Sequence, residues 1–290
     1  MTVPNYYEKF RCIADKCRHS CCIGWEIDID ADTMELYSSL EGELADKIRE
    51  NITGETPHFV LRENDRCPFL TANGLCEIIS CYGEDALCDI CYLHPRFQND
   101  YETFTETGLG MCCEEASRII LSCEERFSVD TPRDITASER QFFAQRQTVF
   151  DVLQNREFTI KQRLDNLAQM YGLSLDFPIK TLCDKYLSLE RLDECWTDIL
   201  NTVRDKDFDE SIFTNKNYQI PFEQLSVYFV FRHFACGLKG IPYSSIINFV
   251  LMSSYLIGAV WSCGYDITDS ARMYSSEIEY SDENTYTLMH

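Results

Sequence analysis

The second half of the chain repeats apolar residues at intervals of three or four positions, which is the period of an amphipathic helix. One such series runs over 179–203 and predicts a helix of about seven turns. Two more apolar segments, 222–237 and 242–263, predict further helices. Capping boxes, in which a hydroxyl residue is followed three positions later by Gln, mark helix starts at Ser138 and Thr159. This half of the chain is therefore expected to form a helical bundle.

The first half shows shorter and less regular patterns. Residues 25–30 alternate apolar and acidic side chains, as a short strand does. Apolar positions over 33–52 and 111–126 predict two helices. Residues 128–134 are mostly polar, contain a proline and indicate a linker between the two halves.

Charge is the first feature of the composition that changes this picture. The 290 residues contain 26 Lys and Arg against 48 Asp and Glu, a formal net charge of −22. Phosphate backbones and anionic membrane surfaces repel such a chain, so no nucleic-acid partner is expected and a membrane partner is disfavoured. A basic or lysine-bearing protein partner is electrostatically permitted.

The location of the protein is also constrained by the sequence. Residues 241–265 carry no charge and are long enough to span a bilayer. Serine and asparagine are spread through this segment, which favours a buried central helix over a membrane span. The N-terminus lacks the basic and apolar regions of a secretory signal. We therefore expect a cytoplasmic, reducing location, in which stable disulfides are rare.

Cysteine is the second abnormal feature of the composition. Twelve of the sixteen cysteines lie between residues 12 and 123, and in a reduced compartment such clustering indicates metal binding or redox chemistry. Thiolates suit both zinc and iron–sulfur clusters. The spacing is irregular, with one C-x2-C pair at Cys88 and Cys91. This favours an iron–sulfur cluster of the 4Fe-4S type and leaves zinc as the alternative.

These patterns together predict a mainly α fold with two domains. Residues 1–127 are expected to form a loop-rich, cysteine-cluster metal-binding domain, packed on an α-helical domain over residues 136–290. The sequence lacks the fingerprint loops of nucleotide-type methyltransferases and dehydrogenases, and it lacks the motifs of P-loop enzymes, zinc proteases and serine hydrolases.

Several motifs surround the cysteines. They are Phe10-x-Cys12-x4-Cys17-x3-Cys21-Cys22-x-Gly24-Trp25, Cys67-Pro68-Phe69-Leu70-x5-Cys76, Leu87-x3-Cys91-x2-His94-Pro95-Arg96-Phe97 and Cys113-Glu114-Glu115-Ala116-x-Arg118. Together with Tyr228-x2-Phe231-Arg232-His233-Phe234 and the segment 274–284, they resemble the flagellin lysine N-methylase family, often called FliB-like. The first cysteine groups also resemble a broader CxxCxxCC zinc- or iron-chelating domain. This sequence departs from the family pattern at Tyr280, where a His is common.

The resemblance implies an enzyme that methylates lysine side chains of flagellin or of another lysine-bearing protein. It implies S-adenosylmethionine as methyl donor and a cysteine-held iron–sulfur cluster. The cysteines that match the family pattern, and are therefore expected to be metal ligands, are Cys12, Cys17, Cys21, Cys22, Cys67, Cys76, Cys91 and Cys113. The additional cysteines at 81, 88, 112 and 123 allow a second cluster.

Charged residues beside these cysteines are candidates for the chemistry. The carboxylates that could orient or deprotonate the substrate lysine are Glu26, Asp28, Glu114 and Glu115. The arginines that could bind the cofactor carboxylate are Arg96 and Arg118. A solvated acidic face and structural ion pairs are the alternative roles. The alternative function is a metal-binding redox sensor, chaperone or structural interaction protein without methylase activity.

Overall fold

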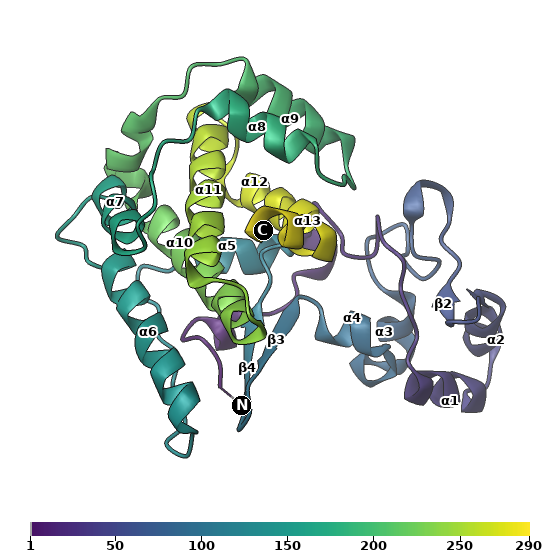
Figure 1. Cartoon of the computed structure of the whole chain (residues 1–290). Helices are drawn as coiled ribbons and strands as arrows, with labels where there is room; N and C mark the ends of the chain where they lie inside the picture. The colour runs from purple at the N-terminus through teal and green to yellow at the C-terminus, as the bar shows by residue number, and fades with distance from the viewer. Residues whose placement is uncertain (1) are drawn as a thin grey trace. The chain divides into compact units, whose positions relative to one another are not determined.

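The computed structural model describes residues 2–290, which form two compact units (Figure 1). The cysteine-rich unit consists of Arg11–Arg96 with Cys113–Glu115. The helical unit consists of the described residues up to Phe10, with Phe97–Cys112 and Ala116–His290. Helices dominate the described chain, so the prediction of a mainly α fold is confirmed. Within 1–127, the segments 97–112 and 116–127 belong to the helical unit by their contacts.

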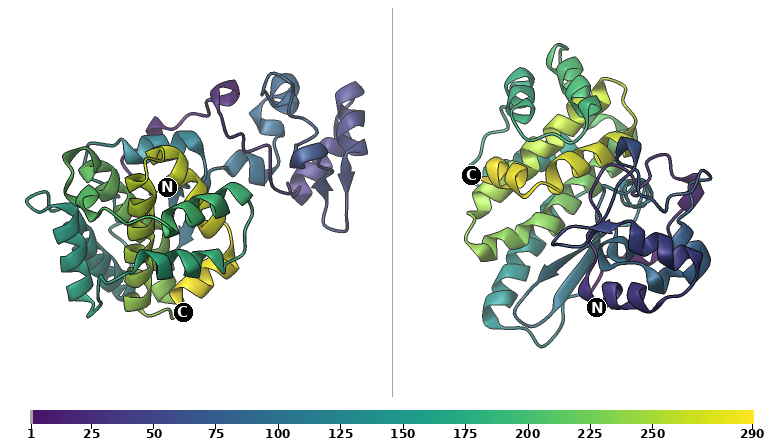
Figure 2. Two further views of the ribbon diagram at one scale, coloured as in Figure 1. Left: turned by 90° about the horizontal axis from the view of Figure 1, so that it is seen from above. Right: turned by 90° about the vertical axis from the view of Figure 1, so that its right-hand side faces the viewer.

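The helical unit is built around two buried helices, α10 (Gln219–His233) and α11 (Tyr243–Ser262), which lie side by side (Figures 1 and 2). The other helices are α5 (Glu114–Leu121), whose first turn lies in the cysteine-rich unit, α6 (Ala137–Leu153), α7 (Ile160–Met170), α8 (Ile179–Leu187), α9 (Glu194–Arg204), α12 (Ile267–Tyr274) and α13 (Asp282–Met289). Helices α7, α8, α9, α12 and α13 all contact α11. The core of this unit therefore follows the length of one uncharged helix.

The burial of α11 explains its composition. All its residues from Phe249 to Trp261 are buried. The hydroxyls of Ser253 and Ser254 donate to carbonyls one turn earlier, at 2.7 and 2.8 Å, so these polar groups are satisfied inside the core. Within residues 2–290, α11 is the helix that is long and apolar enough to cross a membrane, and 83% of its apolar window is buried inside the protein. This burial matches the predicted central helix.

The single long helix predicted over 179–203 is wrong. The chain forms α8 and α9 with a turn between them. The carboxylate of Glu277 accepts hydrogen bonds from the backbone N–H groups of Leu192 and Asp193 at 3.0 and 2.8 Å. The backbone donors of the turn therefore have partners. Leu192 belongs to the apolar series but is 63% exposed. The local pattern could not reveal this break, because the residue that stabilises it lies 85 positions away in the chain.

The two predicted capping boxes have different outcomes. Thr159 and Gln162 form the box that begins α7, as predicted. The box that begins α6 uses Thr136 and Glu139 instead of the predicted Ser138 pair. Glu139 also accepts the N–H and hydroxyl of Thr103 at 2.9 Å each, a tertiary contact that favours the earlier start.

The cysteine-rich unit packs short elements around a small core. Two helices, α1 (Ala31–Ser39) and α2 (Glu43–Glu50), replace the single helix predicted over 33–52. The chain turns between them at Gly42, whose φ of +103° is a conformation that glycine adopts without strain. The other elements are β1 (Ile52–Thr53), β2 (His58–Phe59), α3 (Glu77–Tyr82) and α4 (Asp89–Leu93). The core includes Ile27, Ile29, Tyr37, Ile48, Phe59, Phe69 and two thiols, Cys67 and Cys88.

A buried ion pair holds the small sheet of the helical unit to its helices. The sheet consists of β3 (Arg96–Asp100) and β4 (Thr105–Leu109). The guanidinium of Arg146 on α6 donates to both carboxylate oxygens of Glu106 on β4, at 2.7 and 2.6 Å. The hydroxyl of Tyr101 also donates to Glu106, at 2.8 Å. Both charged side chains are almost fully buried, so each depends on the other for solvation.

We expect Arg146→Ala to lower the free energy of unfolding by about 3–5 kcal/mol, because Glu106 would be left buried without its cation. Denaturant unfolding measures this loss. The matched control is Lys161→Ala, which breaks the exposed pair with Asp165 on α7 and should cost at most about 1 kcal/mol. Equal losses in the two variants would contradict the role assigned to the buried pair.

Candidate metal centre

The thiols of the cysteine-rich unit form two neighbouring sets. The first set contains Cys12, Cys17, Cys21 and Cys113: Cys12 interacts electrostatically with Cys17 and Cys21, and Cys113 interacts with Cys21. The hydrogen bond to Cys22, then burial, and then the charges of Cys22, Cys12 and Cys113 raise the pKa of Cys21. In the same way, burial, Glu114 and Cys12 raise the pKa of Cys17, although the carbonyl of His19 accepts its thiol.

The second set contains five thiols. They are Cys22, Cys67, Cys76, Cys88 and Cys91. Burial, together with the nearby Cys22, Cys76 and Cys88, raises the pKa of Cys67 to about 12. The hydrogen bond from the Cys21 thiol lowers the pKa of Cys22 to about 7. Each set therefore collects sulfurs that cannot all ionise together without a compensating cation.

Backbone contacts bring the second set together. The N–H of Cys67 donates to the carbonyl of Cys22 at 2.9 Å, which ties two segments distant in the chain. Cys76 directly precedes α3, and the N–H of Glu77 donates to the carbonyl of Phe69 at 2.8 Å. Cys88 directly precedes α4, so Cys91 lies one turn away on the same side.

The eight cysteines predicted as ligands all belong to these two sets, four to each. Cys88, which was predicted only as an additional cysteine, lies in the second set and shares a hydrogen bond with Cys91. Cys81 is exposed, and Cys123 is buried in the helical unit, where its thiol faces the carbonyl of Glu125.

The spacing of the thiols bears on the metal that they suit. A tetrahedral zinc site with Zn–S bonds of about 2.3 Å keeps its sulfurs roughly 3.8 Å apart. Among the described residues, three potential ligand side chains bring their ligand atoms within 4.8 Å of one another: those of Glu26, Asp28 and His58. This group contains no cysteine. In the part of the chain that the structure describes, no three thiols therefore all lie this close together, although Cys21 with Cys22 and Cys88 with Cys91 share hydrogen bonds. A cubane iron–sulfur cluster, which places iron and sulfide between the thiolates, holds its four cysteines farther apart.

Glu114 stabilises the loop that carries the first set. Its carboxylate accepts the backbone N–H groups of Arg18 and His19 at 2.9 and 3.2 Å, and the Arg18 Nε at 2.9 Å. Burial opposes ionisation, but these hydrogen bonds prevail and lower the pKa of Glu114. Glu114 was predicted as a candidate base; its oxygens in this structure hold the loop after Cys17.

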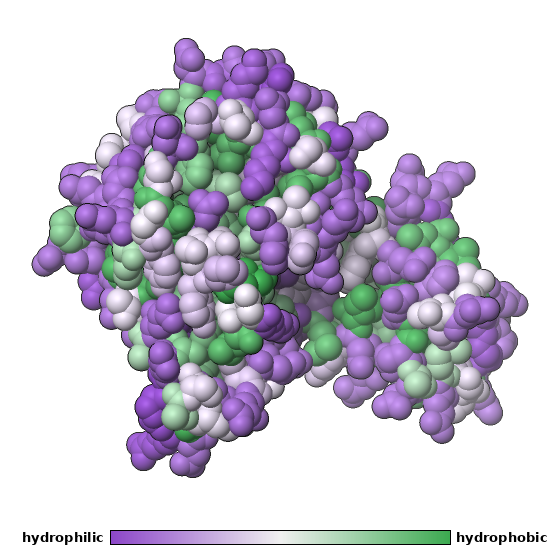
Figure 3. All heavy atoms as spheres, in the orientation of Figure 1, coloured by the Kyte–Doolittle hydropathy of each residue, from purple (hydrophilic) through white to green (hydrophobic). Residues whose placement is uncertain are grey.

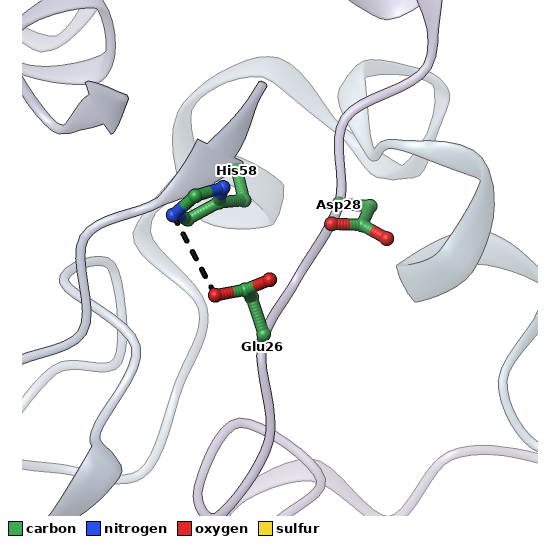
Figure 4. A group of neighbouring side chains, drawn as sticks. All are labelled: Glu26, Asp28 and His58. Carbon is green, nitrogen blue, oxygen red and sulfur yellow. Dashed lines mark ion pairs between the residues drawn. The ribbon is translucent and has the colours of Figure 1, made fainter. Parts of the chain in front are cut away.

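The other predicted residues lie in different surroundings. Glu26 and Asp28 are exposed and converge on His58 (Figure 4). Glu115 is half-buried at the start of α5. Arg96 donates to the carbonyls of Tyr92 and His94 at the end of α4. Arg118 is exposed in the helical unit, whereas Arg96 ends the first segment of the cysteine-rich unit.

His94 is a donor that the list of expected ligands did not include. Its Nε2 is buried and has no hydrogen-bond partner. Its ring packs against Trp25 at 5.7 Å, and the Trp25 indole N–H donates to the carbonyl of Cys21. Burial, and then the charge of Arg96, lower the pKa of His94 to about 4, so the imidazole is neutral near pH 7. The signal in the sequence was its position three residues after Cys91.

A buried polar centre occupies the helical unit. The carboxylate of Glu279 accepts the hydroxyl of Tyr228 at 2.8 Å and lies 2.7 Å from the Nε2 of His233. Arg232 also pairs with Glu279, and its guanidinium lies between the rings of Phe97 and Tyr280, 4.7 and 5.1 Å from their centroids. Arg232 and His233 are thus both paired with a carboxylate inside the core. Their partner Glu279, which ends a π-helical segment (Ser275–Glu279), was missed.

Comparison with known proteins gives a distant relationship. No protein-family profile matches the chain, and no solved structure matches it. The chain is 27% identical over 136 residues to the "Lysine-N-methylase" of Salmonella typhimurium and to that of Salmonella choleraesuis. It is 26% identical over 136 residues to the "Flagellar biosynthetic protein FliU" of Salmonella muenchen.

Each match covers only part of the proteins compared, which limits what it says about the function of this chain. Each covers 42% of this chain, 32% of either methylase and 77% of FliU. The matched part therefore spans about a third of the length of the two methylases. The chain is distantly similar to proteins named for lysine methylation and for flagellar biosynthesis.

We expect Glu114→Gln to increase hydrogen exchange at the amides of Arg18 and His19 by about ten- to a hundredfold, because each loses a hydrogen bond to a charged acceptor. NMR exchange rates at these two amides measure the effect. Glu43→Gln, an exposed substitution in the first turn of α2, is the control and should leave them unchanged. Unaltered exchange in the Glu114 variant would show that the carboxylate does not hold this loop.

Proposed function

We propose that this chain is a cytoplasmic protein-lysine N-methylase that uses S-adenosylmethionine and cysteine-held iron–sulfur clusters, with flagellin or another lysine-bearing protein as substrate. The observation that carries the proposal is the presence of two converging thiol sets in a chain similar to proteins named "Lysine-N-methylase". Neither part suffices alone. Clustered thiols bind metal in many proteins, and the similarity covers only part of each methylase.

The donor chemistry fits iron–sulfur clusters. The residues that would hold one cluster are Cys12, Cys17, Cys21 and Cys113, and those that would hold another are Cys22, Cys67, Cys76 and Cys91, with Cys88 as a fifth thiol. Soft thiolates gathered in sets of four and five support this assignment. When bound, a cluster held by four thiolates would supply an electron donor, whereas a cluster held by only three of them would leave one iron open to chelate the amino and carboxylate groups of S-adenosylmethionine.

The overall reaction is balanced without a net oxidant or reductant. The lone pair of the lysine Nζ forms a bond to the methyl carbon, the bond from that carbon to the sulfonium sulfur breaks, and its electron pair stays on sulfur. The Nζ then carries one proton too many and releases it. The lysine must enter as a neutral amine, so the site has to desolvate the ammonium or supply a base.

An acidic groove in the cysteine-rich unit is complementary to a lysine side chain. Apolar walls come from Leu36, Leu87 and the ring of Tyr92, which suit the aliphatic stem of lysine. The carboxylates that line the groove are Asp30, Asp32, Glu84, Asp85 and Asp89. Asp30 is engaged, since it accepts the N–H groups of Thr33 and Asp89 at 2.8 and 2.9 Å. Hydrophilic side chains also cover much of the surface (Figure 3), in keeping with a net charge of −22 and a basic substrate.

We expect the anaerobically purified protein to contain iron with matching acid-labile sulfide, and to transfer methyl groups from S-adenosylmethionine to lysines of flagellin. Cys17→Ser and Cys76→Ser should each remove at least about half of the iron, because the two residues belong to different sets. Cys195→Ser, an exposed thiol on α9, is the control.

The measurements are iron and sulfide analysis and mass spectrometry of the substrate lysines. Stoichiometric zinc without sulfide would contradict the proposal and favour a structural zinc or metal-storage protein. Full clusters without methyl transfer to any lysine substrate would favour a redox sensor.

We expect His94→Gln to change the visible and electron paramagnetic resonance spectra of the bound cluster, because the buried Nε2 is an unused donor beside the Cys21 segment. His290→Gln, at an exposed position that follows α13, should leave both spectra unchanged. Spectra identical to those of the parent protein in the His94 variant would mean that this imidazole does not face the cluster.

A further inference from the structure

A short ladder places three potential ligands on one outer face of the cysteine-rich unit. The extended segment that contains Glu26 and Asp28 runs antiparallel to β2. The N–H of Phe59 donates to the carbonyl of Ile27 at 3.1 Å, and Asp28 faces His58 across the ladder. Since side chains alternate along extended chains, the buried Ile27 and Phe59 point into the core. Glu26, Asp28 and His58 therefore point away from it.

The three side chains converge (Figure 4). One ligand atom from each of Glu26, Asp28 and His58 lies within 4.8 Å of the other two. The Nε2 of His58 is 3.5 Å from the Oε2 of Glu26. A bound cation with bonds of about 2.0–2.2 Å would draw these atoms closer by small rotations of exposed carboxylates.

The imidazole of His58 is oriented for coordination. Its Nδ1 lies 2.9 Å from the carbonyl of Thr56, and as a donor there it leaves the lone pair on Nε2, on the side of the carboxylates. A histidine ligand commonly donates its other nitrogen to a backbone carbonyl in this way. Gly54 makes room for the ring, because a Cβ at that position would lie 2.6 Å from the His58 Cε1. The ring is thus held by neighbours that are not themselves potential ligands.

We propose that Glu26, Asp28 and His58 bind a divalent first-row transition metal of the Mn²⁺ or Fe²⁺ class, separate from the thiol sets. Two carboxylates and one neutral imidazole carry a net charge of −2, which balances the cation. The nitrogen donor disfavours Mg²⁺ and Ca²⁺, and the absence of thiolate from this triad distinguishes it from the soft cysteine sites. Three protein ligands leave positions for water or for a substrate oxygen. As ligands, Glu26 and Asp28 would not serve as the lysine base.

The test is a titration of the full chain, purified with its thiol centres loaded, with Mn²⁺ alone. The decrease of the free Mn²⁺ paramagnetic resonance signal reports binding, and Mn²⁺ is chosen because it prefers oxygen and nitrogen to thiolate. We expect a single Mn²⁺ site per chain, and at least about a tenfold loss of affinity in His58→Ala and in the near-isosteric Asp28→Asn. The control is Glu55→Gln, an exposed carboxylate in the turn between β1 and β2, which should retain parental affinity.

Iron, sulfide and lysine methylation are measured on the same preparations, so failure of this site and failure of the proposed methylase are distinguished. Retained affinity in both ligand variants, despite folded protein by circular dichroism, would overturn the proposal. Absence of Mn²⁺ binding by the parent chain would also overturn it and would leave Glu26 and His58 as a surface ion pair.

Discussion

Mutual repulsion of neighbouring thiolates is the constraint on which the cysteine-rich unit depends. Its helices are short, its strands contain two residues each, and its core includes Cys67 and Cys88 among few apolar side chains. A unit of this kind gains little stability from burial alone. The same buried surroundings make several ionised sulfurs costly, as the raised pKa of Cys67 records. A cation that neutralises the sulfurs would therefore stabilise the fold and complete the site in one step.

The helical unit depends on a different arrangement, in which apolar helices enclose a few paired charges. Glu106 with Arg146, and Glu223 with Arg163, are buried pairs that join segments distant in the chain. Loss of either partner of such a pair would leave the other charge buried without compensation. In a chain of net charge −22, a buried arginine also compensates the excess of carboxylates from within. The scaffold can thus keep an acidic exterior and a specific interior together.

The sequence predicted the parts of the structure that depend on local spacing. The central helix α11, the capping box at Thr159 and the grouping of the eight cysteines into neighbouring thiol sets follow from patterns within short segments. The break in the helix predicted over 179–203 does not, because Glu277 stabilises it from elsewhere in the chain. The role of Glu114 was missed for the same reason, since its partners lie about a hundred positions earlier. Long-range hydrogen bonds leave no trace in a periodic pattern.

The adjacency of Cys21 and Cys22 links the two thiol sets through a single peptide bond. Cys21 belongs to the first set and Cys22 to the second, and the two thiols share a hydrogen bond. Coordination at either residue would fix the backbone of the other, so occupation of one set would lower the entropic cost of occupying the second. Assembly of the two centres would then be cooperative, and the same peptide would give electrons a short covalent route from one centre to the other.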